Sequence, residues 1–579
     1  MRRVLLAAVA ASMLLVVAGC GGDDNGSSSG GSGATKPAQG KKGGSITVLQ
    51  SSDVDYLDPG HTYYTLGYAV VYPTQRPLYS FKPNEQNPTP DLAESDPEIS
   101  SDRKTITVKL RKGVKFSPPV NREVTSKDVK YALERAFTQN VANQYTTYFT
   151  DIVGAPKKPG KFKEISGITT PDDQTLVIKL SKASGVGVAA ALVMPITVPV
   201  PKEYAQKYDE KNPSTYNTHV IATGPYMVQN DSSGKLVGYK PGRSIKLVRN
   251  PNWDSKTDYK PAYLDSILIR TNASDAEVSA RQTLGGSHLM TGENPPASVL
   301  KTAVTKNKGQ YVQLPGGGFR YFALNNTVKP FDDINVRKAV IAGFNRDAAR
   351  LARGGRFVGD MPTHYIPPGI PGFDEAGGAE GFGVDFLKNP KGDPALSAEY
   401  FKKAGFKSGK YDGNQEFTLV ASNSGPGKAQ AEVAQSEFEK MGFKVKLQTV
   451  PQDAVYTEYC QVPKKKLFSC GTAGWFKDFN DPQSMLEPTF KGSAINEDGG
   501  NNNLAQLNDP KIDAAMDKAA TLAGDERYQA WADIDKMITE AAPAVPFLWD
   551  KTTVLQSKDV QGAGNAYYDG WDYTFTSVK

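Results

Sequence analysis

The sequence predicts an α/β or α+β fold, because short strands with one apolar face alternate with amphipathic helices from residue 45 to near the C-terminus. Residues 45–49 form the first predicted strand. Residues 105–110 alternate strictly, with apolar side chains at Ile106, Val108 and Leu110, which predicts a strand with one solvated face. Residues 416–450 contain a strand, a helix and a second strand in succession, and this crossover implies parallel pairing.

The first predicted helix begins near residue 126. Thr125 and Asp128 have the spacing of a capping box, in which each side chain binds the other residue's backbone N–H. The residues that follow on its core face are Val129, Leu133 and Phe137. A further half-buried strand is predicted by the alternating residues Leu176, Ile178 and Leu180.

The last elements are predicted by their end signals. In the crossover at residues 416–450, Gly442 ends the helix and a strand follows. A final helix ends ahead of Pro543, and an apolar strand follows at residues 545–549. The core-facing residues of this final helix are Trp531, Ile534 and Ile538.

The N-terminus has the features of a secretory signal peptide over residues 1–19. Arg2 and Arg3 precede an uncharged run that is too short for a stable membrane span, and small residues follow. Residues 17–20, Val-Ala-Gly-Cys, resemble a lipobox, so we expect cleavage before Cys20 and a lipid anchor on it. The alternative is ordinary signal cleavage beside an incidental cysteine.

Residues 20–44 are rich in Gly and Ser and lack apolar periodicity, which predicts a disordered tether. A flexible chain of this length would hold the folded part about 25 to 30 Å from the anchor.

The remaining cysteines, Cys460 and Cys470, form an even pair that could close a short disulfide loop outside the cytosol, and two free thiols are the alternative. The four histidines lack metal-ligand spacing, and we expect no metal and no cofactor. The formal net charge is +6 with both signs interspersed, which argues against nucleic-acid binding. The length predicts more than one domain.

Several stretches together carry a family resemblance. They are residues 57–59 (Leu-Asp-Pro), 90–95, 110–116, 124–129, 223–226 (Thr-Gly-Pro-Tyr), 249–253, 333–339 and 474–482. In this order they resemble the peptide-binding, or family 5, solute-binding proteins of ABC importers, from about residue 43 to near the C-terminus. One departure is Gln75-Arg76-Pro77-Leu78, where many members have Tyr-Glu-Gly-Leu. The ligand preference of the best-known members therefore does not transfer automatically.

The resemblance implies a two-lobed periplasmic-binding-protein-like fold of type II, cluster C, with an additional domain and a cleft between lobes hinged by paired strands. The implied segments are residues 45–80, 215–310 and 540–579 for lobe 1, 81–214 for the additional domain and 311–539 for lobe 2. It also implies an exported, monomeric lipoprotein that faces the extracytoplasmic side and hands a small solute to permease subunits. A peptide is the leading ligand, and nickel chelates, haem, sugars and opines stay open.

Residues 474–482 supply the main candidate site. Asp481 precedes Pro482 as a helix N-cap would, so its role is structural. Asp478 lies between Phe476 and Phe479, where an unpaired carboxylate would be costly. In the relatives, an aspartate at the matching place takes the ligand's α-ammonium group, and we carry that role to Asp478. The alternative is an internal salt bridge to a lysine or arginine.

Other candidates surround this residue. Trp475 and Phe476 are expected to form an apolar wall, with ordinary core packing as the alternative. Tyr63 and Tyr64 follow the first strand in a loop and can stack or hydrogen-bond, although scattered surface tyrosines are common. After a glycine run come Phe319 and Arg320, the latter a candidate clamp for a carboxylate.

Two other functions are compatible with parts of the sequence. A hydrolase is suggested by the G-x-S-x-G match at residues 26–30, but this lies in the tether without the required strand and helix. The S-x-x-K match at residues 101–104 is expected to be a turn before a strand, and residues 185–190 only partly match a dinucleotide fingerprint. A surface sensor or adhesin that uses the binding fold without transport also stays open. We expect a binding protein and not an enzyme.

Overall fold

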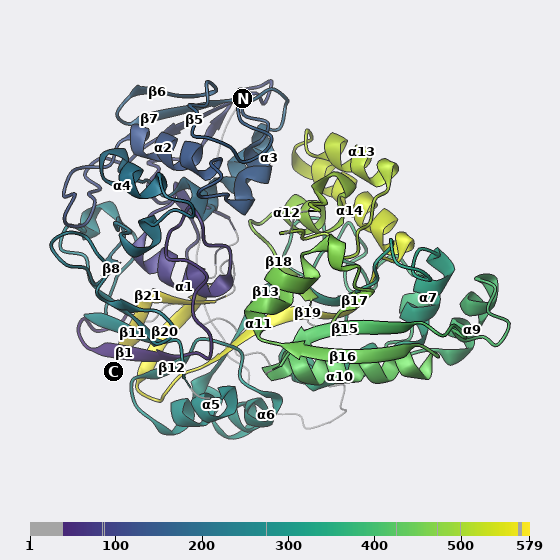
Figure 1. The fold of residues 1–579 in the computed structure, drawn as a ribbon. Helices are drawn as coiled ribbons and strands as arrows, with labels where there is room; N and C mark the ends of the chain where they lie inside the picture. Colours follow the sequence, from purple (N-terminus) through teal and green to yellow (C-terminus); the bar gives the residue numbers. More distant parts are fainter. Residues whose placement is uncertain are drawn as a thin grey trace, which may run out of the picture. The chain divides into compact units, whose positions relative to one another are not determined.

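The computed structural model describes residues 39–579 apart from 84, 86, 274, 424, 472, 498, 499 and 566–569 (Figure 1). The predicted signal peptide, Cys20, and the tether up to residue 38 lie outside the described residues. Within the described ranges, no helix combines the length and the apolar character that crossing a membrane requires.

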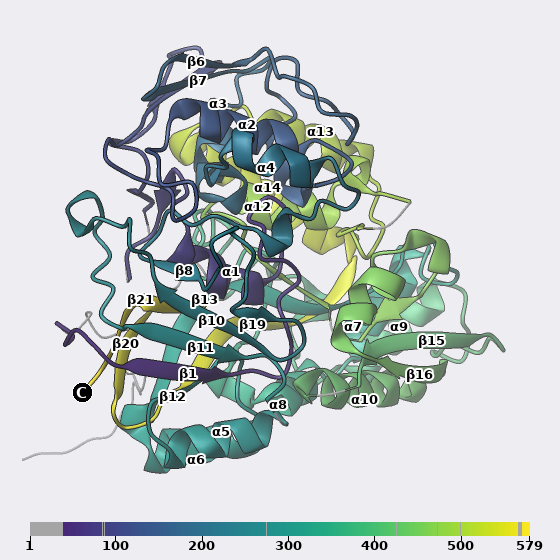
Figure 2. The same cartoon turned by 60° about the vertical axis from the view of Figure 1, so that its left-hand side comes forward.

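A six-stranded mixed sheet contains the first predicted strand. Its strands, from one edge, are β12 (Leu289–Thr291), β1 (Ser45–Leu49), β11 (Ser266–Arg270), β10 (Ser244–Arg249) and β8 (Tyr226–Val228), with β9 (Tyr239–Lys240) also beside β10. β1 is parallel to both its neighbours, whereas β10 is antiparallel to its own. The helices α5 (Ala276–Gly285) and α6 (Ala297–Lys306) lie together at the β12 edge (Figure 2).

The core of this sheet joins distant parts of the chain. Ile46 and Val48 of β1 pack in one cluster with Val70 of α1 (Thr65–Thr74). The same cluster includes residues of the C-terminal hairpin formed by β20 (Val560–Asn565) and β21 (Gly570–Val578). Early, middle and C-terminal segments therefore share one core.

A second, antiparallel sheet contains both predicted alternating strands. Its order is β4 (Glu98–Ile99), β5 (Thr105–Lys109), β7 (Thr175–Lys179) and β6 (Ile168–Asp172). Ile106 and Val108 are fully buried, as the alternation predicts. The helix α2 (Ser126–Ala136) packs on this sheet and begins with the predicted capping box between Thr125 and Asp128.

The motif matches at residues 101–104 and 185–190 lie in short structural elements. Residues 101–103 form the expected turn before β5, and residues 185–190 form the short helix α3 (Gly185–Ala190) instead of a strand-to-helix nucleotide loop. β2 (Tyr79–Ser80) and β3 (Thr89–Pro90) form a small separate hairpin.

The predicted crossover is confirmed. β15 (Glu416–Ser422) is parallel to β16 (Lys444–Val450), and α10 (Gly425–Lys440) connects them. Gly442 has φ +97°, and a Cβ there would lie 2.1 Å from the Tyr411 carbonyl oxygen, so glycine is required at this stop. β17 (Ser469–Cys470) pairs with the other side of β15.

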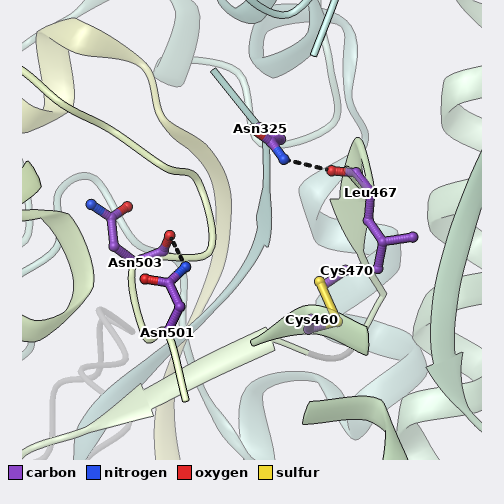
Figure 3. The surroundings of a disulfide bond; sticks show 6 residues. All are labelled: Asn325, Cys460, Leu467, Cys470, Asn501 and Asn503. Carbon is purple, nitrogen blue, oxygen red and sulfur yellow. Dashed lines mark hydrogen bonds between the residues drawn. A yellow bond between two sulfur atoms is a disulfide. The ribbon is translucent and has the colours of Figure 1, made fainter. Parts of the chain in front are cut away.

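A disulfide joins Cys460 and Cys470, with an S–S distance of 2.26 Å and a Cα–Cα distance of 6.0 Å (Figure 3). Cys460 ends a π-helical turn (Val455–Cys460) that follows the short α11 (Gln452–Ala454), and Cys470 ends β17. The bond ties this turn to the strand that leads towards residues 473–478.

Two long strands form the centre of another antiparallel sheet. β13 (Tyr311–Ala323) pairs along β19 (Ala544–Leu555), with β18 (Ala473–Phe476) beside β13 and β14 (Gly359–Asp360) beside β19. A bridge between Met290 and Gln556 connects the end of β19 to the six-stranded sheet. The sequence predicted only residues 545–549 of β19, because Asp550-Lys551-Thr552-Thr553 hides the apolar pattern.

Helices complete the cores on either side of this sheet. On the β15 side they are α7 (Ile334–Gly343), α8 (Arg346–Arg353) and α9 (Pro394–Lys403), and on the other side α12 (Pro482–Phe490), α13 (Pro510–Ala519) and α14 (Gly524–Ala541). The final helix ends before Pro543 as predicted, and Trp531, Ile534 and Ile538 are buried.

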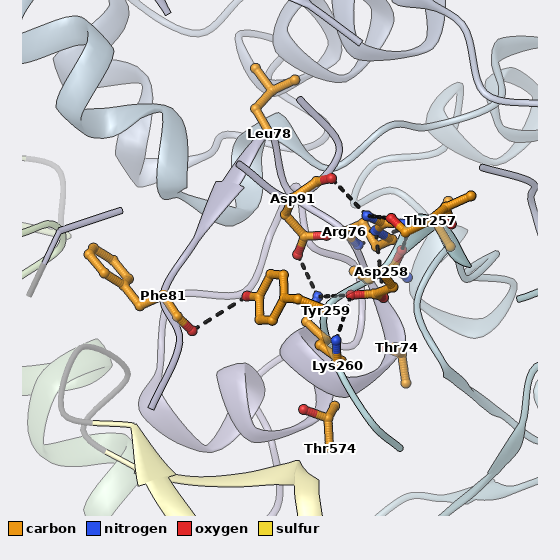
Figure 4. A network of polar contacts seen from close by, with 12 residues as sticks. Thr74, Arg76, Leu78, Phe81, Asp91, Thr257, Asp258, Tyr259, Lys260 and Thr574 are labelled. Atoms are coloured by element: carbon orange, nitrogen blue, oxygen red, sulfur yellow. Dashed lines mark hydrogen bonds and ion pairs between the residues drawn. The ribbon is translucent and has the colours of Figure 1, made fainter. Parts of the chain in front are cut away.

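Arg76, which stands where the family pattern is broken, belongs to a buried charge network (Figure 4). Its Nε donates to Asp91 Oδ1 over 2.6 Å, and Lys260 Nζ donates to Asp91 Oδ2 over 2.5 Å. Asp258 lies 3.7 Å from Arg76 and 3.9 Å from Lys260, so two cations face two carboxylates. All four side chains are at most 2% exposed. The network explains Arg76 as a structural residue that ties residues 76–91 to residues 257–260.

We expect Asp91→Ala to lower the free energy of unfolding by about 3 to 5 kcal/mol, because two buried cations lose their shared carboxylate. Urea-induced unfolding measures the change. Glu432→Ala, which removes an exposed carboxylate paired with Lys428, is the control and should stay within the error of the measurement. An equally small loss for Asp91→Ala would contradict a stabilising network.

Candidate functional site

The edge strand β18 carries the main candidate residues and is aligned by β13. Trp475 pairs with Phe319, and Gly474 pairs with Arg320. Paired residues of an antiparallel ladder share a face, so Trp475 and Phe319 point to one side and Arg320 to the other. A Cβ at Gly318 would lie 2.5 Å from the Phe476 ring, so the glycine makes room for that ring.

Asp478 follows this strand and meets residues from distant segments. Its Oδ2 accepts a hydrogen bond from the Tyr148 hydroxyl over 2.5 Å, and the Tyr63 hydroxyl donates a second one. In the described part of the chain, no lysine or arginine forms an ion pair with it. The internal salt bridge that the sequence left open is therefore not found there.

Burial raises the pKa of Asp478 from 3.8 to about 7, and the two tyrosine hydrogen bonds lower it only in part. Part of the residue's surface stays accessible. Burial also raises the pKa values of Tyr63, Tyr145 and Tyr148 well above the usual range, and the nearby Asp478 charge adds to this. These tyrosines are therefore neutral near neutral pH, and within the described structure the buried Tyr145 hydroxyl has no hydrogen-bond partner.

Aromatic rings enclose the carboxyl group. The Tyr63 ring lies 4.8 Å from that of Tyr145 and 6.2 Å from that of Trp475, measured between centroids. The Tyr148 ring meets Phe479 edge-on at 4.9 Å. Trp475 is 8% exposed and fixed by a 2.8 Å hydrogen bond from its Nε1 to the Ser484 carbonyl oxygen. The group is thus surrounded by rigid apolar surface with a few directed hydroxyls.

The loop that carries Tyr63 is held by Asp55. Its carboxylate accepts from the Thr62 hydroxyl over 2.6 Å and from the backbone N–H groups of Tyr63 and Tyr64 over 2.6 and 3.1 Å. Tyr64 is the N-cap residue of α1. Asp55 therefore fixes the backbone from which the Tyr63 ring projects.

Tyr145 and Tyr148 come from the short 3₁₀ helix η1 (Gln144–Phe149). Asn143 caps this helix: its side chain accepts from Tyr145 N over 2.7 Å and donates to the Gly60 carbonyl oxygen over 2.7 Å. This single side chain links η1 to the Tyr63 loop. Neither tyrosine is predicted from the sequence, since η1 has no helical or strand periodicity and only its aromatic content distinguishes the stretch.

Two other candidate residues lie differently from the sequence expectation. Phe319 is 0% exposed and packs in the core against Tyr365 and Phe490, so its ring is not available to a ligand in this structure. Because Phe319 pairs with Trp475, its side chain points to the same side of the sheet as Trp475. Arg320 donates to Asp550 over 2.5 Å, and its guanidinium lies 4.7 Å from the centroid of the half-buried Phe476 ring.

Asp550 also accepts from Arg353 over 3.3 Å, so Arg320 shares its carboxylate with a second arginine. The expected clamp for a ligand carboxylate is thus engaged within the protein in this structure. Asp481 has the predicted capping role: it accepts from Gln483 N and pairs with Arg527 over 2.9 Å. Across the described residues, no group of three or more His, Cys, Asp or Glu side chains could hold a metal ion.

Comparison with known proteins identifies the family. The model for bacterial extracellular solute-binding proteins, family 5, matches residues 87–497, most of the chain. The chain belongs to this family of solute-binding proteins. The resemblance seen in the sequence is thereby confirmed.

The similar proteins are named for different ligands. The chain is 27% identical to heme-binding protein A of Haemophilus influenzae, covering 81% of this chain and 80% of that one. It is 26% identical to a dipeptide-binding protein of Pseudomonas aeruginosa, covering 85% and 88%. Both likenesses extend over nearly the whole folded part.

Solved structures confirm the predicted two-lobed α/β fold. The clavulanic acid biosynthesis oligopeptide binding protein 2 matches with a TM-score of 0.80 at 22% identity, covering 95% of this chain and 98% of that one. The oligopeptide-binding protein of Haemophilus influenzae, in complex with a nine-residue peptide, matches with a TM-score of 0.73 at 19% identity, covering 93% and 100%.

We expect Asp478→Asn to be more stable than the parent protein at about pH 8, by roughly 2 to 4 kcal/mol, and to lose this advantage towards pH 4. The sign follows from the pKa of about 7 in the folded protein and 3.8 in the unfolded chain: the folded state holds the extra proton between these values, so its stability falls as the pH rises through 7. Urea unfolding across this pH range measures it. Asp412→Asn, at an exposed carboxylate, should change neither the free energy of unfolding nor its dependence on pH.

Proposed function

We propose that this solute-binding protein captures a short peptide through its free amino terminus and hands it to an ABC importer. The observation that carries the proposal is the Asp478 carboxyl group, which is surrounded by aromatic rings and held by two neutral hydroxyls without a cation in the described residues. A buried carboxylate of this kind is stabilised by a bound ammonium group, which supplies the missing charge.

The relatives support a peptide among the family's ligands. Proteins from Pseudomonas aeruginosa, Escherichia coli and Bacillus subtilis with 23–28% identity are named dipeptide-, di/tripeptide- or oligopeptide-binding proteins. The named relatives are binding proteins, and we infer that this chain binds its solute without transforming it. The haem-binding relative matches over a similar length, so the relatives alone do not select a peptide. The proposal depends instead on the Asp478 carboxyl group, which suits the free amino terminus of a ligand.

Asp478 and its neighbours have distinct roles in this proposal. Asp478 accepts hydrogen bonds from the ligand's ammonium group, and Tyr63 and Tyr148 keep the carboxylate oriented. Trp475 contributes apolar surface beside Tyr63, and Tyr64 begins the helix that follows this loop. Phe476 and Arg320 lie on the opposite face from Trp475, where Arg320 pairs with Asp550, so they are assigned no direct contact with the ammonium group. Water leaves as the lobes close on the ligand, and each remaining polar contact becomes stronger in the lower dielectric.

The export signal and the lipid anchor complete the proposal. A signal peptide at residues 1–19, a diacylglycerol on Cys20 and a tether to residue 44 would keep the binding domain near the membrane on its extracytoplasmic side. A monomer tethered in this way can present its ligand to permease subunits. We retain residues 45–80, 215–310 and 540–579 as lobe 1, 81–214 as the additional domain and 311–539 as lobe 2.

A library of tri- to pentapeptides, free or N-acetylated, tests the ligand class. We expect native mass spectrometry to detect complexes with free peptides only, because acetylation removes the ammonium charge. Asp478→Asn should weaken the best free peptide by about 2 to 5 kcal/mol in calorimetry. Asp412→Asn, at an exposed carboxylate, is the matched control. Equal binding of free and acetylated peptides would refute the assignment of Asp478.

The affinity of a free peptide is expected to fall about tenfold for each pH unit below 7. Asp478 has a pKa of about 7 before binding, and a bound ammonium requires its ionised form, so binding releases a proton at lower pH. Above about pH 8 the peptide's own amino group loses its charge, and the affinity falls again. Calorimetry in buffers of different ionisation enthalpy counts the protons. A flat profile from pH 5 to 7 is the outcome that excludes this linkage.

A further inference from the structure

A pocket of about 360 Å³ lies away from Asp478, between α2, the helix α4 (Lys202–Asp209) and the loop at residues 160–162. Figure 2 shows α2 and α4 next to each other on this part of the fold. The pocket is lined by Tyr131, Arg135, Thr138, Gln139, Asn140, Gly160, Lys161, Phe162, Lys202, Gln206, Asp209 and Glu210. None of these residues contacts the Asp478 carboxyl group, and the size lies in the usual range for small-molecule sites.

The floor of the pocket is a closed ion network. Arg135 donates to Asp209 through Nε over 2.7 Å and to Asp58 through Nη1 and Nη2 over 2.9 and 2.7 Å. Asp209 also accepts from the hydroxyls of Tyr131 and Ser214 over 2.8 and 2.7 Å. The two carboxylates Asp58 and Asp209 share the single guanidinium of Arg135, so this network is engaged within the protein and leaves ligand recognition to the rim.

The rim presents a fixed ammonium group beside two aromatic rings. Lys202 Nζ lies 5.3 Å from the centroid of Phe162 and 5.8 Å from that of Tyr131. Cation–π contacts of this kind hold the lysine in place without neutralising it. Among the described residues, Lys202 forms no ion pair; the nearby Glu134 carboxylate pairs with Lys130. Phe162 is 43% exposed.

Three other lining side chains also favour an anionic ligand. Lys161 adds a second cation, and the amides of Gln139 and Gln206 add hydrogen-bond donors. Among the lining residues, the cations Arg135, Lys161 and Lys202 outnumber the carboxylates Asp209 and Glu210. An anionic group with a flat apolar body suits this combination, because the rings offer stacking surface and the lysines offer charge.

We propose that this pocket is a second ligand site that binds a small aromatic carboxylate, with its ring against Phe162 and Tyr131 and its carboxylate at Lys202. The pocket does not include Asp478 or its tyrosines. The second ligand is therefore held independently of the solute between the lobes, and the two are bound at the same time.

Benzoate is the probe, with saturation-transfer NMR and calorimetry on the full folded chain. We expect saturable binding with a Kd below about 10 mM, and at least about tenfold weaker binding of benzylamine, which has the ring but the opposite charge. Acetate, which has the charge without the ring, should also bind at least about tenfold more weakly. No saturation by benzoate up to about 10 mM would overturn the proposal.

Three variants locate the probe. Lys202→Glu should weaken benzoate at least about tenfold, and it should fold, because an acidic residue suits the first turn of α4. Phe162→Ala, at an exposed ring, should weaken it about threefold or more. Lys112→Glu is the matched charge reversal on an exposed lysine outside the pocket and should leave the affinity unchanged.

Asp478→Asn separates this site from the one proposed for peptides. Unchanged benzoate binding in that variant supports a separate pocket, whatever happens to peptide binding. Loss of benzoate in Asp478→Asn, or undiminished binding in Lys202→Glu, would overturn the second site while leaving the proposed peptide site untouched.

Discussion

The carboxyl group of Asp478 has to be accommodated among aromatic rings with no cation of the described residues beside it, and the surrounding structure depends on this constraint. Two tyrosine hydroxyls provide hydrogen bonds but no charge, so the ionised form stays costly near neutral pH. A buried carboxylate without a cation lowers the stability of the folded protein, and a cationic ligand would remove this cost. The proposed role of Asp478 in solute binding depends on this desolvated carboxylate.

Other buried charges in the same chain are arranged in the opposite way. Asp91 and Asp258 face Arg76 and Lys260, and Asp58 and Asp209 face Arg135. In each cluster every carboxylate lies within ion-pair distance of a buried cation. Asp478 differs from these carboxylates in having no cation among the described residues, and this difference supports its proposed role in ligand binding. Asp55 and Asn143 complete the picture, because they fix the backbone from which the neighbouring tyrosines project.

The fold could be predicted where local signals agree with tertiary packing. The capping box at Thr125, the alternation of Ile106 and Val108, and the stop at Gly442 each act within a few residues, and each is found in the structure. The long strand β19 was predicted only in part, because its polar second half is specified by pairing with β13 and not by its own pattern. The same dependence on pairing buries Phe319, which the sequence had suggested for the site.

The sequence by itself determined the family and the α/β alternation, and it proposed residues 474–482 as the candidate site, because these depend on motif order and on spacing within short segments. Only the tertiary structure decided that Asp478 lacks a cation among the described residues and that Tyr63 and Tyr148 are its partners. Residues 63, 148 and 478 are separated by long stretches of chain, and burial depends on everything that packs around a group. Desolvation is therefore a property of the folded arrangement, which no local pattern contains.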